Sequence, residues 1–286
     1  MWRHSGLKYN PKATFMSLMQ NVPSALALTS LSHAGPAMRW RTEAMRSHPT
    51  ARLILITKGQ GRVTVAGLTN GYGPNNLIYL PPQTMYGIEV GPTVHGHVLT
   101  LPDTANWPAD PVHLRLLDVW LQKEAAQYFD QIERELQPAG HPRAAALWLG
   151  LLAIFVDRQA RAQVATPNDS RRDSAAAKLV ARYTQLIARD FQLDRGVGSY
   201  AAELGVTPTH LARCCQQVAG RSALALLHDR IHYEACVLLR DTQIPINQIA
   251  ETLGFHSAAY FTRSFQEKSG QTPTDFRRAN ERSMAR

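Results

Sequence analysis

Two arginines stand at matching places in an internal repeat near the C-terminus. Arg213 and Arg263 lie fifty residues apart, and the segments around them, 211–220 and 261–270, align without a gap, with arginine, glutamine and glycine in register. Each segment follows a run of small residues that ends in a glycine turn. A helix, a turn containing glycine and a second helix form a helix-turn-helix. The repeat therefore predicts two such units in one chain.

The second helix of a helix-turn-helix places its N-terminal residues in the DNA major groove. Arginine can donate two hydrogen bonds to guanine O6 and N7, and the methyl groups of alanine and threonine suit the thymine methyl. We therefore predict that the exposed residues at these places contact bases. The alternative is that the two arginines contact phosphate only. The candidate DNA-binding residues are Thr209, Ala212, Arg213, Ala258, Ala259, Thr262 and Arg263.

Helix start signals support this division. Thr207 precedes Pro208, and Ser257 occupies the corresponding place in the second copy, so each can cap a helix. Between the copies, residues 222–240 are apolar at helical spacing. A helix of this length measures about 28 Å, close to the ~34 Å between successive major-groove faces. One chain could then read two adjacent turns of a duplex.

The order of these motifs resembles the DNA-binding domain of the AraC/XylS family of transcription regulators. The match covers Ser174 to about Arg278. Cys214-Cys215 departs from the family pattern, which has an apolar residue and phenylalanine there, and Gly196-Val197-Gly198 replaces helix-favouring residues. The resemblance implies promoter DNA and RNA polymerase as partners, and a homodimer. Its most specific motifs are Ile-Ala-x-x-Leu-Gly-Phe at 249–255, Tyr-Phe-x-Arg-x-Phe at 260–265 and Gly-x-Thr-Pro-x-x-Phe-Arg at 270–277.

The first hundred residues contain short strand-like runs at roughly ten-residue spacing, which is typical of a small barrel or jelly roll. The segment from Gly59 to Thr84, with its glycine and proline turns, resembles the cupin-like sensor domain of the same family. A barrel closed at one end forms a pocket, the usual place for a small-molecule effector. The predicted strands are 52–57, 62–66, 77–80, 85–90 and 94–101.

Four residues are candidates for effector binding: Arg39, Tyr86, His95 and His97. His95 and His97 are two apart on one predicted strand, so they share a face, and Tyr86 lies one strand away. If they face inward, all three can hydrogen-bond an effector; ordinary surface or filler histidines are the alternative. Arg39 and its neighbours Trp40 and Arg41 suit a carboxylate, although a solvated strand edge explains them as well. The histidine pair lacks the Glu and further His of metal-binding cupins, so we expect no metal and no cofactor.

From Pro111 the apolar spacing becomes helical, with one stripe over 112–121 and a second helix that begins after His141-Pro142 and includes Leu147, Leu151 and Ile154. In the family, helices after the barrel pair two subunits. The alternative is that they pack back on their own barrel.

These observations predict an α+β chain of two domains. An N-terminal arm, 1–30, precedes a cupin-like sensor and dimerisation domain, 31–160. A polar linker, 161–173, leads to the all-α domain of two helix-turn-helix units joined by a long helix, 174–286.

Composition fits a DNA-binding protein. The 286 residues include 31 basic and 22 acidic side chains, a net charge of +9, which favours a polyanionic partner. The three cysteines show no metal-binding spacing, and buried reduced thiols fit a cytoplasmic protein. The longest apolar run, Leu147–Val156, is too short to span a bilayer, and polar residues interrupt the apolar stretch 15–28. We therefore expect neither a membrane partner nor a signal peptide.

The resulting hypothesis is a transcription regulator whose barrel senses a small molecule and thereby changes how the two helix-turn-helix units sit on promoter DNA. One alternative is a ligand-independent DNA-binding regulator whose barrel only dimerises. Another is a cupin enzyme with an appended DNA-binding module. We expect no enzyme, since no Ser/His/Asp or Cys/His set has supporting context.

Overall fold

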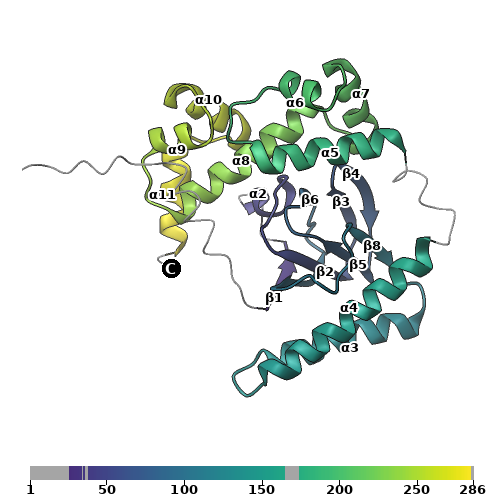
Figure 1. Cartoon of the computed structure of the whole chain (residues 1–286). Coiled ribbons are helices and arrows are strands. Elements are labelled where there is room, and N and C mark those ends of the chain that lie inside the picture. Colours follow the sequence, from purple (N-terminus) through teal and green to yellow (C-terminus); the bar gives the residue numbers. More distant parts are fainter. Residues whose placement is uncertain (1–25, 34, 36–37, 165–173, 285–286) are drawn as a thin grey trace, which may run out of the picture. The chain divides into compact units, whose positions relative to one another are not determined.

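The computed structural model describes residues 26–33, 35, 38–164 and 174–284 (Figure 1). The described residues form two compact units. The larger unit contains residues up to 190 together with 196–230, and the smaller contains 191–195 and 231–284. Most of the predicted arm, 1–30, lies outside the described residues, but its last residues belong to a strand that begins at Ala27.

Two antiparallel sheets form the N-terminal part of the larger unit. The five-stranded sheet has the order β1-β7-β2-β5-β8, and the three-stranded sheet has the order β4-β3-β6. This is the sheet-rich half that the short, evenly spaced runs predict. The bounds are β1 Ala27–Ser32, β2 Ala51–Lys58, β3 Gly61–Val65, β4 Leu68–Tyr72, β5 Asn76–Leu80, β6 Tyr86–Ile88, β7 His95–Leu101 and β8 Val112–Arg115.

The two faces of the five-stranded sheet bury different residues, because side chains alternate along each strand. On β2, Ile54 and Ile56 point into the space between the two sheets, while Leu53 and Leu55 belong to a second core on the opposite face. Both sets are apolar, so the central strands read as continuous hydrophobic runs without visible alternation. The inter-sheet core, the interior of the barrel, consists of Leu31, Ile54, Ile56, Val63, Val65, Tyr72, Ile78, Leu80, Tyr86, Ile88, Val90, Val94 and Val98.

Three strands were not predicted: β1, most of which falls in the predicted N-terminal arm, and β4 and β8. Residues 70–74 look like a chain break, yet β4 runs through Asn70 and Gly71, because the actual turn is Ala66-Gly67, with both residues at positive φ. Residues 112–115 look helical but form β8, whose Val112 and Leu114 pack against the outer core, and Leu116, just beyond the strand, continues this period of two. The helix predicted from Pro111 therefore begins later, at Val119.

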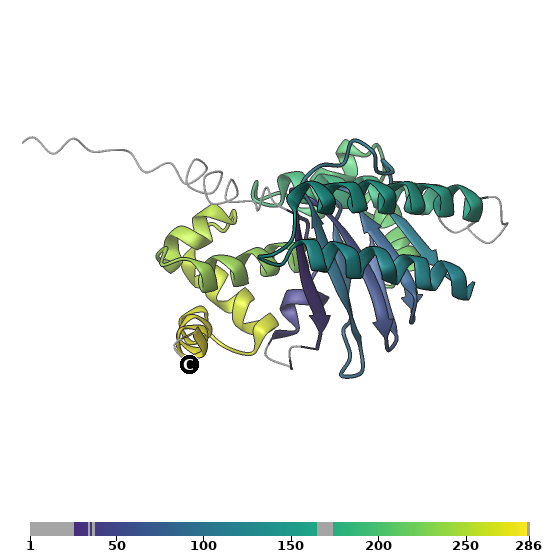
Figure 2. The ribbon, with the colours of Figure 1, turned by 90° about the horizontal axis from the view of Figure 1, so that it is seen from below.

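Helices α3 (Val119–Glu135) and α4 (Pro142–Val164) lie side by side across the outer face of the five-stranded sheet (Figure 2). Phe129, Leu152 and Phe155 are nearly inaccessible and pack on that face. Helix α4 continues to Val164, so the first residues of the predicted linker are helical. The rest of that linker, 165–173, lies outside the described residues.

The larger unit also holds the first helix-turn-helix. Helix α5 (Ala175–Asp190) precedes α6 (Val197–Glu203) and α7 (Pro208–Ala219), and a buried hydrogen bond from the Tyr183 hydroxyl to the Ala223 carbonyl joins α5 to α8 (Ala223–Asp241). Helix α8 begins in the larger unit and ends in the smaller one.

The β3–β4 hairpin contacts this helix-turn-helix within the larger unit. The Thr69 hydroxyl donates to the Ala219 carbonyl at 3.0 Å, at the end of α7. A Cβ on Gly67 would lie 2.3 Å from Cγ1 of Val180 on α5, so the hairpin tip packs closely against that helix.

The smaller unit contains the second helix-turn-helix, α9 (Ile246–Thr252) and α10 (Ala258–Ser269), and the final helix α11 (Pro273–Met284). Phe261, Phe265 and Phe276 form its aromatic core. Arg277 on α11 donates to the carbonyls of Leu239 and Ile244, which ties α11 to the turn after α8. The fold class predicted from sequence, α+β with an all-α C-terminal part, is confirmed.

Candidate functional site

The first reading helix, α7, has the predicted start. The Thr207 side chain accepts a hydrogen bond from the backbone N–H of His210, and Pro208 occupies the first helical position. Leu211, Cys214 and Cys215 are buried, whereas Thr209, Ala212 and Arg213 are exposed on the other side. The three predicted reading residues therefore share an accessible surface at the start of the helix.

The second reading helix, α10, repeats this arrangement. Ser257 accepts from the backbone N–H of Tyr260, and Phe261 and Phe265 anchor the buried side. Ala259 and Arg263 are exposed, and Ala258 and Thr262 are partly exposed.

Both reading helices end alike. Gly220 and Gly270 adopt the left-handed conformation and each donates its N–H to the glutamine carbonyl four residues earlier. The register of the sequence repeat is thus reproduced in the structure from cap to cap.

The cysteine pair in α7 is accommodated as core. Cys214, Cys215 and Cys236 are buried and form no disulfide with one another. Burial raises the pKa of the Cys215 thiol to about 12, as expected for a small apolar-like side chain.

Two further exposed residues lie beside the predicted DNA-binding residues and were not among them. His210 lies one turn before Arg213 on α7, and its Nδ1 is 3.2 Å from a terminal nitrogen of Arg213. Tyr260 holds the matching place on α10, is 53% exposed and packs its ring against Phe255. The alignment of the repeats, which pairs His210 with Tyr260, was the available signal.

Tyr86 lies in the barrel interior, but its ring is already in contact with other side chains. The Arg46 guanidinium lies 4.1 Å from the centroid of the Tyr86 ring, and the centroid of the His48 ring lies 5.8 Å from it. Arg46 also donates to the carbonyls of Thr42 and Ala44. Burial first, and then the charges of nearby arginines, hold the pKa of His48 well below its usual value. Hydrophobic and cationic contacts thus surround Tyr86 on several sides.

His95 and His97 share a face, but that face is not the barrel interior. On β7, Val98 points into the inter-sheet core and Leu99 into the outer core. Because side chains alternate along a strand, His95 and His97 lie on the same face as Leu99. His97 tilts against Phe129 of α3 at 6.1 Å, and His95 is exposed. The structure therefore does not bring the two histidines together with Tyr86.

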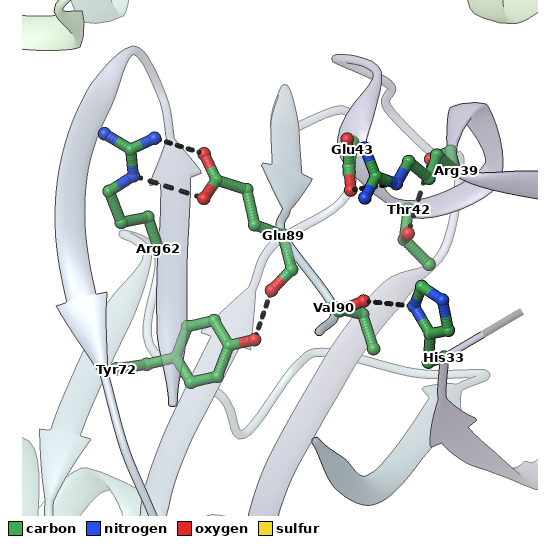
Figure 3. Close-up of polar contacts among 8 residues, drawn as sticks. All are labelled: His33, Arg39, Thr42, Glu43, Arg62, Tyr72, Glu89 and Val90. Atoms are coloured by element: carbon green, nitrogen blue, oxygen red, sulfur yellow. Dashed lines mark hydrogen bonds and ion pairs between the residues drawn. The ribbon is translucent and has the colours of Figure 1, made fainter. Parts of the chain in front are cut away.

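Arg39 stands at the start of α2 (Trp40–Glu43) and is exposed (Figure 3). Its guanidinium lies 3.6 Å from the Glu43 carboxylate. The adjacent Arg41 guanidinium lies 6.0 Å from the centre of the Trp40 ring, so the predicted cation and ring cluster exists.

A cavity of about 280 Å³ lies at the end of the barrel where β4 leads into β5, lined by Gly71, Tyr72, Gly73, Asn76 and Arg115. Tyr72 belongs to the barrel core, and its hydroxyl donates to the Glu89 carbonyl beside the Arg62–Glu89 ion pair (Figure 3). Burial, followed by the charge of Glu89, raises the pKa of Tyr72 to about 12.

The polar side chains that line this cavity differ in how many hydrogen bonds they make within the protein. Asn76 is buried, and its amide is occupied by the Pro74 carbonyl and His113. Arg115 is exposed and makes one long hydrogen bond, 3.5 Å, to the Gly71 carbonyl. No carboxylate of the described chain lies within ion-pair distance of Arg115. The cavity therefore presents a cation whose donors remain largely available.

Among the described residues, no three His, Cys, Asp or Glu side chains lie close enough together to hold a metal ion. Each helix in the described part of the chain is too short or too polar to cross a lipid bilayer.

Comparison with known proteins assigns both halves of the chain. Residues 32–152 match the AraC-like ligand binding domain, and residues 200–279 match a helix-turn-helix domain. The arabinose operon regulatory protein of Escherichia coli is 26% identical over 239 residues, covering 79% of each chain. The activator RhaR of Escherichia coli is 24% identical over 262 residues, 83% of this chain and 88% of RhaR.

Among solved structures, the C-terminal domain of AraT from Geobacillus stearothermophilus shares 33% identity over 37% of this chain and 88% of its own, with a TM-score of 0.36. The two matched domains occur here in the order sensor, then helix-turn-helix. The chain belongs to the AraC family: it is a DNA-binding transcription regulator with an N-terminal ligand-binding domain.

Proposed function

We propose that this regulator reads two adjacent major-groove segments of promoter DNA with the first turns of α7 and α10. The observation that carries the proposal is the repeated surface: each capped helix buries an apolar side and exposes an arginine at the same place, Arg213 and Arg263. Thr209 and Ala212 flank the first arginine, and Ala258, Ala259 and Thr262 flank the second. Arginine suits guanine, and the methyl groups suit thymine.

Selection of bound fragments from a random DNA pool tests this proposal. At moderate salt with nonspecific competitor, we expect a motif of two blocks about one helical turn apart, since phosphate contacts alone weaken as salt rises. Arg213→Ala and Arg263→Ala should each relax one block, at a cost of about 1–3 kcal/mol. Gln216→Ala, on the exposed C-terminal part of α7, is the matched control.

An equal loss of affinity for all sequences in both arginine variants would reduce these residues to phosphate contacts. A selected motif with a single block would restrict base reading to one of the two units.

We further propose that the effector occupies the cavity beside Tyr72 and carries an anionic group toward Arg115. The support is the available guanidinium at the end of the barrel and the absence of side chains at Gly71 and Gly73, which keeps the cavity open. Guanidinium and carboxylate pair well. The earlier candidates Arg39, Tyr86, His95 and His97 stay predictions, and the structure distributes them over separate surfaces.

A thermal-shift screen of small carboxylates and their neutral amides tests the effector site, because a ligand bound by the native state raises the melting temperature. We expect a carboxylate that stabilises the wild type, and a smaller shift in Arg115→Gln. Arg62→Gln, which removes an exposed arginine already paired with Glu89, is the control. Stabilisation by the same carboxylate that is unchanged in Arg115→Gln would place the effector elsewhere. A screen without any hit would favour the ligand-independent alternative.

We propose that the protein is cytoplasmic, acts on RNA polymerase at promoters, has no enzymatic activity and works as a homodimer. The dimer is supported by an exposed apolar stripe on α4, Leu147, Leu151 and Ile154, which its own barrel leaves uncovered.

A further inference from the structure

The side chain of Arg213 has a hydrogen-bond partner on its own helix. A terminal guanidinium nitrogen of Arg213 lies 3.2 Å from Nδ1 of His210, and Nε2 of His210 lies 3.7 Å from Sγ of Cys214. His210 and Arg213 are exposed, whereas Cys214 is buried. The imidazole thus connects a surface arginine to the core of the first reading helix.

The chemistry of the three groups fixes the direction of both hydrogen bonds. A guanidinium can only donate, so Nδ1 of His210 must accept and carries no proton. The neutral imidazole then carries its proton on Nε2, which donates to the sulfur of Cys214. Donor and acceptor roles agree along the whole chain of contacts, from Arg213 through His210 to Cys214.

We propose that His210 is a positioning residue that holds the Arg213 guanidinium for base recognition. The inference rests on the proposed role of Arg213 as a base reader. A free arginine has many rotamers, and ordering it on DNA costs conformational entropy. The hydrogen bond to His210 supplies part of that order before DNA binds. It occupies one of five N–H donors, so a bidentate pair remains for guanine.

The second unit provides a natural comparison. Tyr260 takes the place of His210, and its ring packs on Phe255. No described residue accepts a hydrogen bond from the Arg263 guanidinium. Arg213 is therefore held before binding, and Arg263 is not, although both occupy the same position in the repeat. The cysteine that departs from the family pattern, Cys214, is part of the arrangement that holds Arg213.

The test measures the base preference of the full-length protein. The two duplexes compared differ at one base pair, the one that Arg213→Ala no longer distinguishes. For the wild type, the dissociation constant for the disfavoured duplex should exceed that for the favoured one by about fivefold to a hundredfold. His210→Leu, which cannot accept a hydrogen bond, should lower the ratio toward that of Arg213→Ala. His210→Asn, which keeps an acceptor near the position of Nδ1, should retain most of it.

These two substitutions separate positioning from helix stability. Leucine favours helix formation more than asparagine does, so a purely structural role predicts the opposite order of the variants. In the Arg213→Ala background, His210→Leu should leave the ratio unchanged, because His210 acts through Arg213.

Three results would overturn the inference, and only the third of them is also a failure of the proposed function. If Arg213→Ala lowers the ratio and His210→Leu does not, base reading stands and positioning is wrong. A further loss from His210→Leu in the Arg213→Ala background would mean that His210 contacts the base itself. If Arg213→Ala leaves every base preference intact, the proposed reading role of Arg213 fails, and positioning fails with it.

Discussion

Gly205 and Gly254 occupy the same position in the two helix-turn-helix repeats, but their surroundings differ. Both adopt positive φ, +71° and +79°, a conformation that side chains disfavour. A Cβ on Gly254 would lie 2.8 Å from the Gln192 carbonyl oxygen and 2.8 Å from the Asp194 N–H nitrogen, whereas nothing lies within 4 Å of one on Gly205. The second turn therefore needs glycine for two reasons and the first for one.

Gly254→Ala should consequently destabilise the protein more than Gly205→Ala. The left-handed conformation alone costs alanine about 1–2 kcal/mol, and the contact with rigid backbone atoms adds to this at residue 254. Urea unfolding of the two variants gives the comparison. Equal losses would show that the segment around Gln192 yields without cost.

At the scale of single residues, the sequence predicted the features that depend on neighbours along the chain. The caps at Thr207 and Ser257 and the exposure of Arg213 and Arg263 follow from local spacing. His95 and His97 show the limit: alternation puts them on one face, but which face is buried by which core depends on α3, far along the chain. His210 was missed because its role depends on side-chain conformation.

At the scale of elements, α4 is a helix with two working sides. One side contributes Leu152, Phe155 and Val156 to the core on the barrel, and the other exposes Leu147 by 67%, Leu151 by 46% and Ile154 by 55%. The exposed residues recur at helical spacing and form one stripe. An apolar stripe of this kind indicates a surface that binds a partner. The same stripe on a second copy of the chain provides a matching apolar surface.

Leu151→Glu should therefore weaken the proposed dimer. A carboxylate in the middle of the stripe would be desolvated without a partner, and we expect the dimer dissociation constant to rise at least about tenfold, or ~1.4 kcal/mol. Sedimentation equilibrium measures this value. Ala146→Glu adds the same charge at an exposed position outside the stripe. A wild-type protein that stays monomeric at high concentration would contradict the prediction.

Element boundaries were predicted less completely than element types. Strand β8 was hidden because Leu116 and Leu117 are adjacent apolar residues that fit a helix as well as a strand end. Strand β4 was hidden by Asn70-Gly71, a common turn pair that here lies within a strand. The last turns of helix α4, up to Val164, contain charged residues. Such residues occur both in exposed helices and in linkers, so they do not mark where this helix ends.

At the scale of the whole molecule, the two cores on either side of the five-stranded sheet each bury a tyrosine. Tyr72 lies in the barrel interior and Tyr79 in the core beneath α3 and α4, where it stacks on Trp107 at 5.1 Å. Burial is the main cause that raises the pKa of each to about 12. Both hydroxyls must therefore stay neutral in the folded protein.

The stability of the larger unit should consequently fall at high pH. Because the folded pKa lies above the unfolded value near 10, the contribution is complete below pH 10 and is lost as pH rises toward 12, up to about 2–3 kcal/mol for each tyrosine. Urea unfolding between pH 8 and pH 11 tests this. Tyr79→Phe should flatten the decline and cost little at pH 8, because no described group bonds its hydroxyl.

Tyr72→Phe is the matched comparison, since it should flatten the decline equally but lose the hydrogen bond to Glu89 at every pH. If the free energy of unfolding falls with pH as steeply in both variants as in the wild type, other groups, such as Cys215, cause the loss of stability at high pH.

The two-part organisation and its order were predicted from sequence and are confirmed by the family matches. The compact units divide the chain inside α8, at a place other than the predicted linker. No sequence pattern announces that division, because it arises from tertiary contacts of the β3–β4 hairpin with α5 and α7.

That hairpin tip limits how freely the parts of this regulator can be exchanged. Gly67 fits against Val180 only because it has no side chain, and the Thr69 hydroxyl on the same hairpin donates to the Ala219 carbonyl at the end of α7. A chimera that joined this barrel to the DNA-binding half of a relative would inherit a surface shaped for a different neighbour. Successful grafts should therefore move the hairpin together with the helices it touches, and substitutions at Gly67 and Val180 should be acceptable only in combination.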